Sequence, residues 1–151
     1  MIKIICIGKI KEQFYRDAIE EYLKRLSKYT KLELIELNDI NSDNTNIILE
    51  KERDEILSKI KEKDYIITLE IEGKELDSIE LSNKINELQI NNSNITFIIG
   101  GSYGIHQDIK NMSNYKLSFS KLTFQHQLFR VMLLEQIYRS FKILNNETYH
   151  K

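Results

Sequence analysis

The apolar residues of this chain gather in short runs, and polar segments separate each run from the next. Runs of roughly 4–8 residues rich in Ile, Leu, Phe and Tyr are typical of strands buried in a sheet. Five such runs predict five strands: Ile2–Ile7, Leu32–Leu37, Tyr65–Ile71, Ile95–Ile99 and Tyr115–Phe119.

Between these runs the apolar residues recur every three or four positions, as they do on an amphipathic helix. A first helix carries an apolar stripe with this period: Phe14, Ala18, Tyr22 and Leu26. Ile56 and Ile60 predict a second helix, which follows the polar loop Asn38–Asn46. A third helix begins after Asp77, whose carboxylate can accept a free backbone N–H while Glu80 reaches back.

The longest predicted helix is His126–Leu144, which carries two adjoining apolar stripes. Strands that alternate with helices predict an α/β fold, in which a mostly parallel sheet is flanked by helices. The chain has 151 residues, and we expect them to form one domain over residues 1–151. Ligands of such sheets bind at the carboxyl ends of the strands. Segments 69–72, 100–104 and 119–124 should therefore meet at one site.

The composition predicts a cytoplasmic protein that does not enter a membrane. No apolar run approaches the roughly 20 residues that span a bilayer, and the charged start of the chain is unlike a secretory signal. The only cysteine, Cys6, lies within an apolar run, so we expect it to pack in the core.

Charge is unevenly distributed, although the net charge of the chain is only −1. Residues 1–100 hold 15 Lys and Arg against 20 Asp and Glu, whereas residues 101–151 hold 7 against 3. The net charges are −5 and +4. A basic face in the last third would suit a polyanion such as RNA. The alternative is a chance scatter of charges over a solvated surface.

Three of the five glycines lie close together, directly after the strand predicted at Ile95–Ile99. Gly100, Gly101 and Gly104 predict either a tight turn or a backbone that a ligand can approach closely. Their spacing does not match the dinucleotide-binding fingerprint, and no Gly-Lys-Ser/Thr of a phosphate-binding loop follows them. The three histidines lack the spacing of metal ligands, so we expect no metal site.

A second unusual segment, SFSKLTFQH at residues 118–126, alternates small polar and apolar side chains before the longest helix. The alternation fits a half-buried strand that continues into a loop. It also fits a binding loop in which Leu122 and Phe124 enclose a flat ring.

Taken together, segments from the whole length of the chain resemble one protein family. They are GKIKE at 8–12, ITLE at 67–70, FIIGGSYG at 97–104, LSFSKLTFQHQ at 117–127 and ETYHK at 147–151. In this combination they resemble the bacterial methyltransferases of the SPOUT superfamily that modify the N3 atom of a pseudouridine in 23S ribosomal RNA.

The resemblance implies a C-terminal trefoil knot, a homodimer, S-adenosylmethionine as methyl donor, and ribosomal RNA within the assembled ribosome as partner. It implies that the donor is held by these residues: Leu69, Gly100, Phe119, Ser120, Lys121, Leu122, Thr123 and Phe124. The family usually has a proline where this chain has Gln125. We expect Gln125 to leave the loop less rigid than proline would.

Methylation at an imide nitrogen requires the loss of its proton, and four groups are candidates for catalysis: His126, Arg130, Tyr149 and His150. Arg130 follows His126 by one helical turn, and its fixed charge could stabilise the deprotonated base or hold a phosphate. Tyr149 and His150 lie at a chain end, so they can act only if docked against a site of their own or the partner subunit. There Tyr149 could stack on the base. The residues do not decide which group accepts the proton.

Two other functions fit the same residues. The fold could methylate another RNA, such as tRNA. The chain could also be an RNA-binding or ribosome-binding module without catalysis, in which the glycines only turn the backbone.

Overall fold

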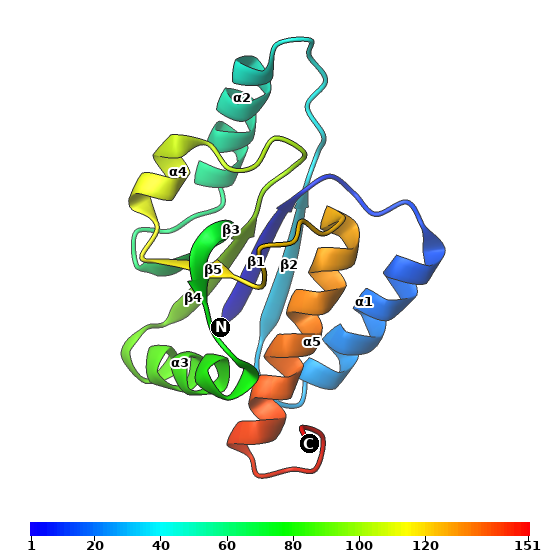
Figure 1. The fold of residues 1–151 in the computed structure, drawn as a ribbon, viewed down its shortest axis with the longest axis vertical. Coiled ribbons are helices and arrows are strands. Elements are labelled where there is room, and N and C mark those ends of the chain that lie inside the picture. Colours follow the sequence, from blue (N-terminus) through cyan, green and yellow to red (C-terminus); the bar gives the residue numbers. More distant parts are fainter.

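A five-stranded sheet runs through the middle of the computed structural model, which describes residues 1–151 (Figure 1). Its strands are β1 (Ile2–Ile7), β2 (Leu32–Leu37), β3 (Asp64–Glu75), β4 (Asn94–Ile99) and β5 (Tyr115–Ser118). Their order across the sheet is β2-β1-β4-β3-β5, and every neighbouring pair is parallel. The predicted α/β fold with a parallel sheet is confirmed, while the trefoil knot stays a prediction.

Helices cover both faces of the sheet (Figure 1). Helices α1 (Gln13–Leu26), α3 (Ser78–Asn91) and α5 (His126–Leu144) pack on one face and share a cluster of 19 buried apolar residues. Helices α2 (Thr45–Leu57) and α4 (Gln107–Met112) pack on the other face, over a smaller cluster of 8. No helix combines the length and the apolar character that a membrane crossing requires.

Strand β1 lies between the two clusters, which explains why its sequence is almost continuously apolar. Its apolar side chains divide between the clusters: Ile2, Ile4 and Cys6 in the larger, Ile5 and Ile7 in the smaller. Burial raises the pKa of Cys6 to about 12, so this thiol is a core residue, as predicted. Lys3 is 3% exposed, and its ammonium donates to Asp64 Oδ2 over 2.9 Å.

Two predicted helices have the expected starts. The carboxylate of Asp77 accepts from the N–H of Glu80 over 2.7 Å, and Glu80 Oε1 accepts from the N–H of Asp77 over 2.9 Å. This is the predicted capping box of α3. Helix α5 begins and ends at the predicted residues, His126 and Leu144.

Other boundaries differ from the predictions. Helix α2 begins at Thr45, within the predicted loop, because the side chain of Asn44 caps it. It ends at Leu57, so Ile60 lies outside the helix. Helix α4 was not predicted, because its six residues are too few to show a helical period. The apolar stripe expected on α1 is wrong at Phe14, whose side chain is 65% exposed.

Candidate active site

A cavity of about 290 Å³ lies at the carboxyl ends of β3, β4 and β5. Residues of all three predicted segments, 69–72, 100–104 and 119–124, line it, and His126 and Phe129 of α5 close one side. The volume is at the lower end of the roughly 300–1,000 Å³ that is usual for small-molecule sites. The three segments meet at one cavity, as expected, and its role as a ligand site stays a prediction.

Seven of the eight residues expected to hold the methyl donor line this cavity: Leu69, Gly100, Phe119, Ser120, Leu122, Thr123 and Phe124. The eighth, Lys121, does not line it and is exposed to solvent. Several walls are apolar, and the rings of Phe119 and Phe124 both contact that of Phe129, with centroids 4.8 and 6.1 Å apart. Such walls can enclose a flat ring.

The glycines of the cavity serve the turn itself. A Cβ on Gly100 would lie 2.5 Å from the carbonyl oxygen of Gly104, and a Cβ on Gly101 would lie 3.0 Å from Glu52 Oε2. Gly104 has a φ of +82°, in the left-handed region that favours glycine. The turn interpretation therefore accounts for the glycine at position 100. Its backbone still forms part of the cavity wall.

The loop before α5 is ordered by its own polar side chains. Ser120 Oγ accepts from the N–H of Leu122 over 3.0 Å, and Ser118 Oγ donates to the carbonyl of Ser120 over 3.0 Å. Gln125 is the N-cap of α5, because its Oε1 accepts from the N–H of Leu128 over 2.8 Å. Gln125 therefore stabilises the junction between the loop and α5. From the sequence we had expected this position to leave the loop less rigid than proline would.

His126 is the one predicted catalytic residue that lies in the cavity wall. Burial lowers its pKa, the nearby Arg130 cation lowers it further, and Asp39 acts weakly in the opposite direction. The imidazole is therefore neutral near pH 7. In that state one of its nitrogens can accept a proton.

Arg130 does not reach the cavity. Its side chain is 1% exposed, and its Nη1 donates to Glu36 Oε2 over 2.8 Å while Nη2 donates to the carbonyl of Ile7. These contacts join the start of α5 to the ends of β1 and β2. The position favours a structural role over the predicted contact with the acceptor base.

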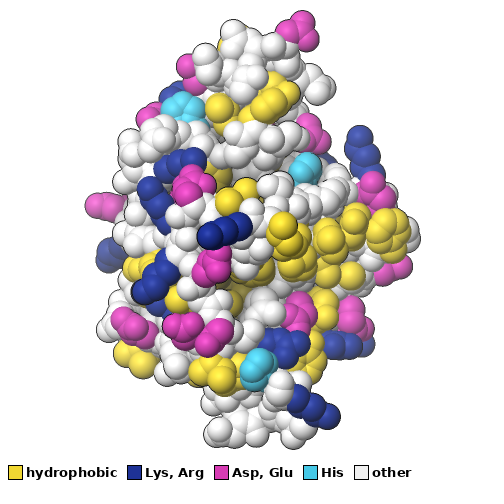
Figure 2. Space-filling view, viewed as in Figure 1, with side chains coloured by type: hydrophobic (Ala, Val, Ile, Leu, Met, Phe, Trp, Pro, Cys, Tyr) yellow, Lys and Arg dark blue, Asp and Glu magenta, His cyan; other side chains and the backbone are white.

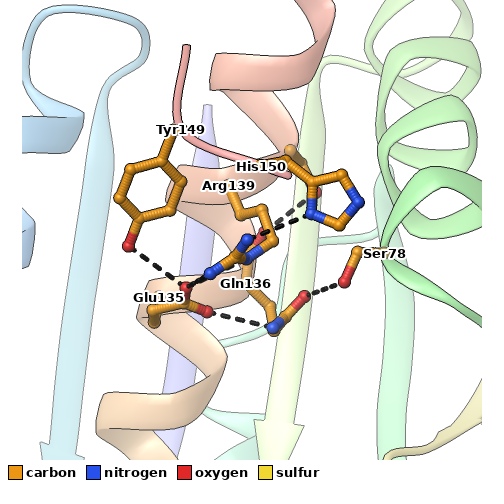
Figure 3. Close-up of polar contacts among 7 residues, drawn as sticks. Ser78, Glu135, Gln136, Arg139, Tyr149 and His150 are labelled. Carbon is orange, nitrogen blue, oxygen red and sulfur yellow. Dashed lines mark hydrogen bonds and ion pairs between the residues drawn. The ribbon is translucent and has the colours of Figure 1, made fainter.

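Tyr149 and His150 gather around Arg139, at the far end of α5 (Figure 3). Arg139 Nη1 lies 3.0 Å from His150 Nδ1, and its guanidinium carbon lies 4.7 Å from the centre of the Tyr149 ring. Glu135 Oε1 accepts from Arg139 Nε over 3.0 Å and from the Tyr149 hydroxyl over 3.2 Å. We call these four residues, Glu135, Arg139, Tyr149 and His150, the C-terminal cluster.

The sequence analysis missed Arg139 and Glu135. The signal was a Glu followed by an Arg four positions later on a predicted helix, which is the spacing of a helical ion pair. Burial raises the pKa of Tyr149 to about 12, and the charge of Glu135 adds to this effect. The phenol therefore stays protonated at neutral pH.

The C-terminal cluster is distant from the cavity within one chain. His126 and Arg139 are 13 positions apart on α5, which corresponds to about 20 Å at the helical rise of about 1.5 Å per residue. A groove between α3 and α5 extends from Phe119 and Phe124, which it shares with the cavity, to Glu135. Figure 3 shows Gln136 beside this cluster, where its Oε1 accepts from the hydroxyl of Ser78 over 2.8 Å.

The basic face expected in the last third of the chain is largely neutralised. Four of its seven cations form ion pairs within the chain: Lys110 with Glu72, Arg130 with Glu36, Arg139 with Glu135 and Lys142 with Glu147. On the face shown in Figure 2, Lys and Arg side chains alternate with Asp and Glu. No three His, Cys, Asp or Glu side chains gather as a metal site would require.

Comparison with known proteins identifies the fold and the family. Residues 1–150 match the family model described as "Predicted SPOUT methyltransferase". The chain belongs to the SPOUT methyltransferase family. Proteins named ribosomal RNA large subunit methyltransferase H from Clostridium tetani and from Clostridium botulinum are each 54% identical to it, over 99% of both chains.

The solved structure of another methyltransferase is also similar in shape. The tRNA (m1G37) methyltransferase of Aquifex aeolicus superimposes with a TM-score of 0.55 at 13% identity, over 91% of this chain and 69% of that one. This likeness concerns the fold.

Membership of the SPOUT methyltransferase family implies a methyl donor of the S-adenosylmethionine type, and the cavity suits one. It offers apolar walls and one buried carboxylate oxygen without a hydrogen bond, Glu70 Oε1.

Proposed function

We propose that this SPOUT methyltransferase uses S-adenosylmethionine to methylate the N3 atom of a pseudouridine in large-subunit ribosomal RNA, on the assembled ribosome and as a homodimer. The relatives that are 54% identical to it are named ribosomal RNA large subunit methyltransferase H, which supports large-subunit ribosomal RNA as the substrate. The residues that the family resemblance assigns to the methyl donor, apart from Lys121, line one cavity.

When bound, the donor supplies a methyl group on a positively charged sulfur. Leu69, the backbone of Gly100 and the loop 119–124 hold it and exclude water from one side. His126 is the proton acceptor in this proposal, because it lies in the cavity wall and is neutral near pH 7. As N3 takes the methyl group, whose bond to sulfur breaks to leave the neutral thioether S-adenosylhomocysteine, the N3 proton would pass to the imidazole of His126.

The C-terminal cluster lies far from the cavity of its own chain, and this separation is the main support for the proposed dimer. About 20 Å of α5 lies between His126 and Arg139. The cluster of one subunit would complete the cavity of its partner, with the Tyr149 ring stacked on the target base. Arg139 would face the negative charge that develops on the base.

An exposed apolar patch supports a dimer interface near the cavity. Figure 2 shows hydrophobic side chains gathered over the start of α1 and the neighbouring half of α5. Phe14 is 65% exposed, Leu122 is 70% exposed and Leu128 is 38% exposed. Patches of this kind on soluble proteins mark contact surfaces.

The substrate is tested by methylation of four samples: 70S ribosomes, 50S subunits, free 23S RNA and tRNA, with radiolabelled donor. Mass spectrometry of the digested RNA then locates the methyl group. We expect incorporation into ribosomal particles, on one pseudouridine. Methylation of tRNA alone would overturn the substrate, and no incorporation despite donor binding would favour a module without catalysis.

The composite site is tested by mixing two inactive chains. Ser120→Trp fills the cavity, and Arg139→Ala removes the centre of the C-terminal cluster. If the cluster serves the partner's cavity, a mixed dimer has one intact site, and an equal mixture regains about a quarter of wild-type activity. If each cluster serves its own cavity, the mixture stays inactive.

A further inference from the structure

Strand β3 leaves its ladder with β5 beside the cavity. Leu117 of β5 is in register with Leu69 and, after a shift, also with Lys74, so residues 70–73 bulge out of the pairing. Bulges of this kind redirect side chains and are common next to active sites. Here the bulge brings Glu70 and Glu72 into the wall of the cavity.

Glu70 is a buried carboxylate with one oxygen left free. Its side chain is 3% exposed. Oε2 accepts from the hydroxyl of Thr68 over 2.6 Å, whereas Oε1 has no hydrogen-bond donor. The nearest cation, Lys110 Nζ, is 3.6 Å from Oε1, which is too far for a hydrogen bond. A buried acceptor without a donor is unfavourable, and more so when it is charged.

Lys110 places a positive charge on the same wall. It belongs to α4, its side chain is 25% exposed, and its Nζ lies 3.1 Å from Glu72 Oε1. The hydrogen bond to Glu72 raises the pKa of Lys110, so the amine is cationic. The cavity wall thus includes a charged pair, Glu70 with Lys110, and an aromatic pair, Phe124 with Phe129.

These two pairs match the two ends of S-adenosylmethionine. Adenine is flat and apolar on its faces, while the amino-acid end carries one ammonium and one carboxylate. We propose that Glu70 Oε1 accepts a hydrogen bond from that ammonium and that Lys110 faces the carboxylate. Glu70 and Lys110 are then binding residues for the amino-acid end. This inference rests on the proposed function. It assigns the ammonium of S-adenosylmethionine to Glu70 and its carboxylate to Lys110.

Calorimetry with two ligands tests this assignment. S-adenosylhomocysteine carries the amino-acid end, whereas 5′-methylthioadenosine keeps the adenosine and lacks that end. We expect Glu70→Gln to weaken binding of S-adenosylhomocysteine by about tenfold or more and to leave binding of methylthioadenosine within about twofold. Lys110→Met should show the same selectivity. Unchanged methylthioadenosine binding also reports that the cavity has kept its shape.

Two exposed residues outside the cavity provide matched controls. Glu75→Gln on β3 and Lys116→Met on β5 should bind both ligands as the wild type does. Equal weakening of both ligands by Glu70→Gln, or no weakening of either, would overturn the assignment. If the wild-type protein bound neither ligand, the proposed function itself would fail, which is a separate outcome.

Discussion

Arg130 Nη1 donates to Glu36 Oε2 over 2.8 Å, across 94 positions of the sequence. The bond joins the start of α5 to the end of β2. Arg130 is 1% exposed, whereas the Glu36 side chain is 32% exposed. An ion pair that is buried on one side is costly to break, because one charge then remains without its partner.

Arg130→Ala should therefore lower the free energy of unfolding by about 2–4 kcal/mol, somewhat less than for a fully buried pair. Urea unfolding followed by circular dichroism measures this. Arg139→Ala, which removes a more exposed ion pair, serves as the comparison and should cost about 1 kcal/mol. A stable Arg130→Ala protein with normal donor binding and lost turnover would instead support a catalytic Arg130.

Glu52 should make the stability of the protein depend on pH. Burial raises its pKa to about 7, and the charge of Asp39 adds to this effect. A carboxyl group whose pKa is raised in the folded state is harder to ionise there than in the unfolded chain. The folded protein therefore loses stability as pH rises through the raised pKa. Glu52→Gln should therefore stabilise the protein by roughly 1–3 kcal/mol at pH 8.5 and change it little at pH 5.

The check is thermal unfolding of Glu52→Gln across this pH range. Glu50→Gln, an exposed position on the same helix, is the control and should show no such trend. Equal effects of Glu52→Gln at both pH values would mean that this carboxyl does not titrate as described.

Two substitutions at Gln125 distinguish the contribution of the helix cap to stability from that of loop rigidity. Gln125→Ala removes the cap of α5 and should cost about 0.5–2 kcal/mol. The φ of Gln125 is −61°, which a proline can adopt. Gln125→Pro should thus recover roughly 0.4–1 kcal/mol of that loss by restricting the unfolded chain. Chemical unfolding of both variants measures the difference, and a proline variant less stable than the alanine variant would contradict it.

The Tyr149 ring, rather than its hydroxyl, should matter for turnover. Tyr149→Phe keeps the ring and should retain activity within about threefold, whereas Tyr149→Ala should lose about tenfold to a hundredfold, as expected for a lost base stack. Because the pKa of Tyr149 is raised to about 12, Tyr149→Phe should not change the pH dependence of kcat between pH 7 and 9. A shifted profile would show that the phenol titrates during the reaction.

The sequence predicted the sheet well because its strands are short apolar runs, and the central strands β1 and β4 are buried almost throughout. β1 and β2 have the predicted limits, and β4 begins one residue earlier. The sequence could not show the bulge at residues 70–73, because strand pairing between distant segments produces it. Glu70 belongs to segment 69–72, which was expected at the site, but the sequence could not show that its Oε1 lacks a hydrogen bond there.

The candidate site was predicted in part. Residues next to one another in the loop 119–124 could be found from their local pattern and from the family resemblance. The spacing of Arg130 from His126 did not reveal its ion pair with Glu36, and its catalytic role stays a prediction. Arg139 was missed, because only the folded chain end brings Tyr149 and His150 against it (Figure 3).

The central claim is that the cavity at the carboxyl ends of β3, β4 and β5 holds the adenosyl methyl donor. A crystal structure of the protein with S-adenosylhomocysteine tests it most directly. We predict ligand density between Leu69, the backbone of Gly100 and Phe124, with the adenine on the apolar side. Density at any other surface, with this cavity unchanged and empty of ligand, would contradict the account.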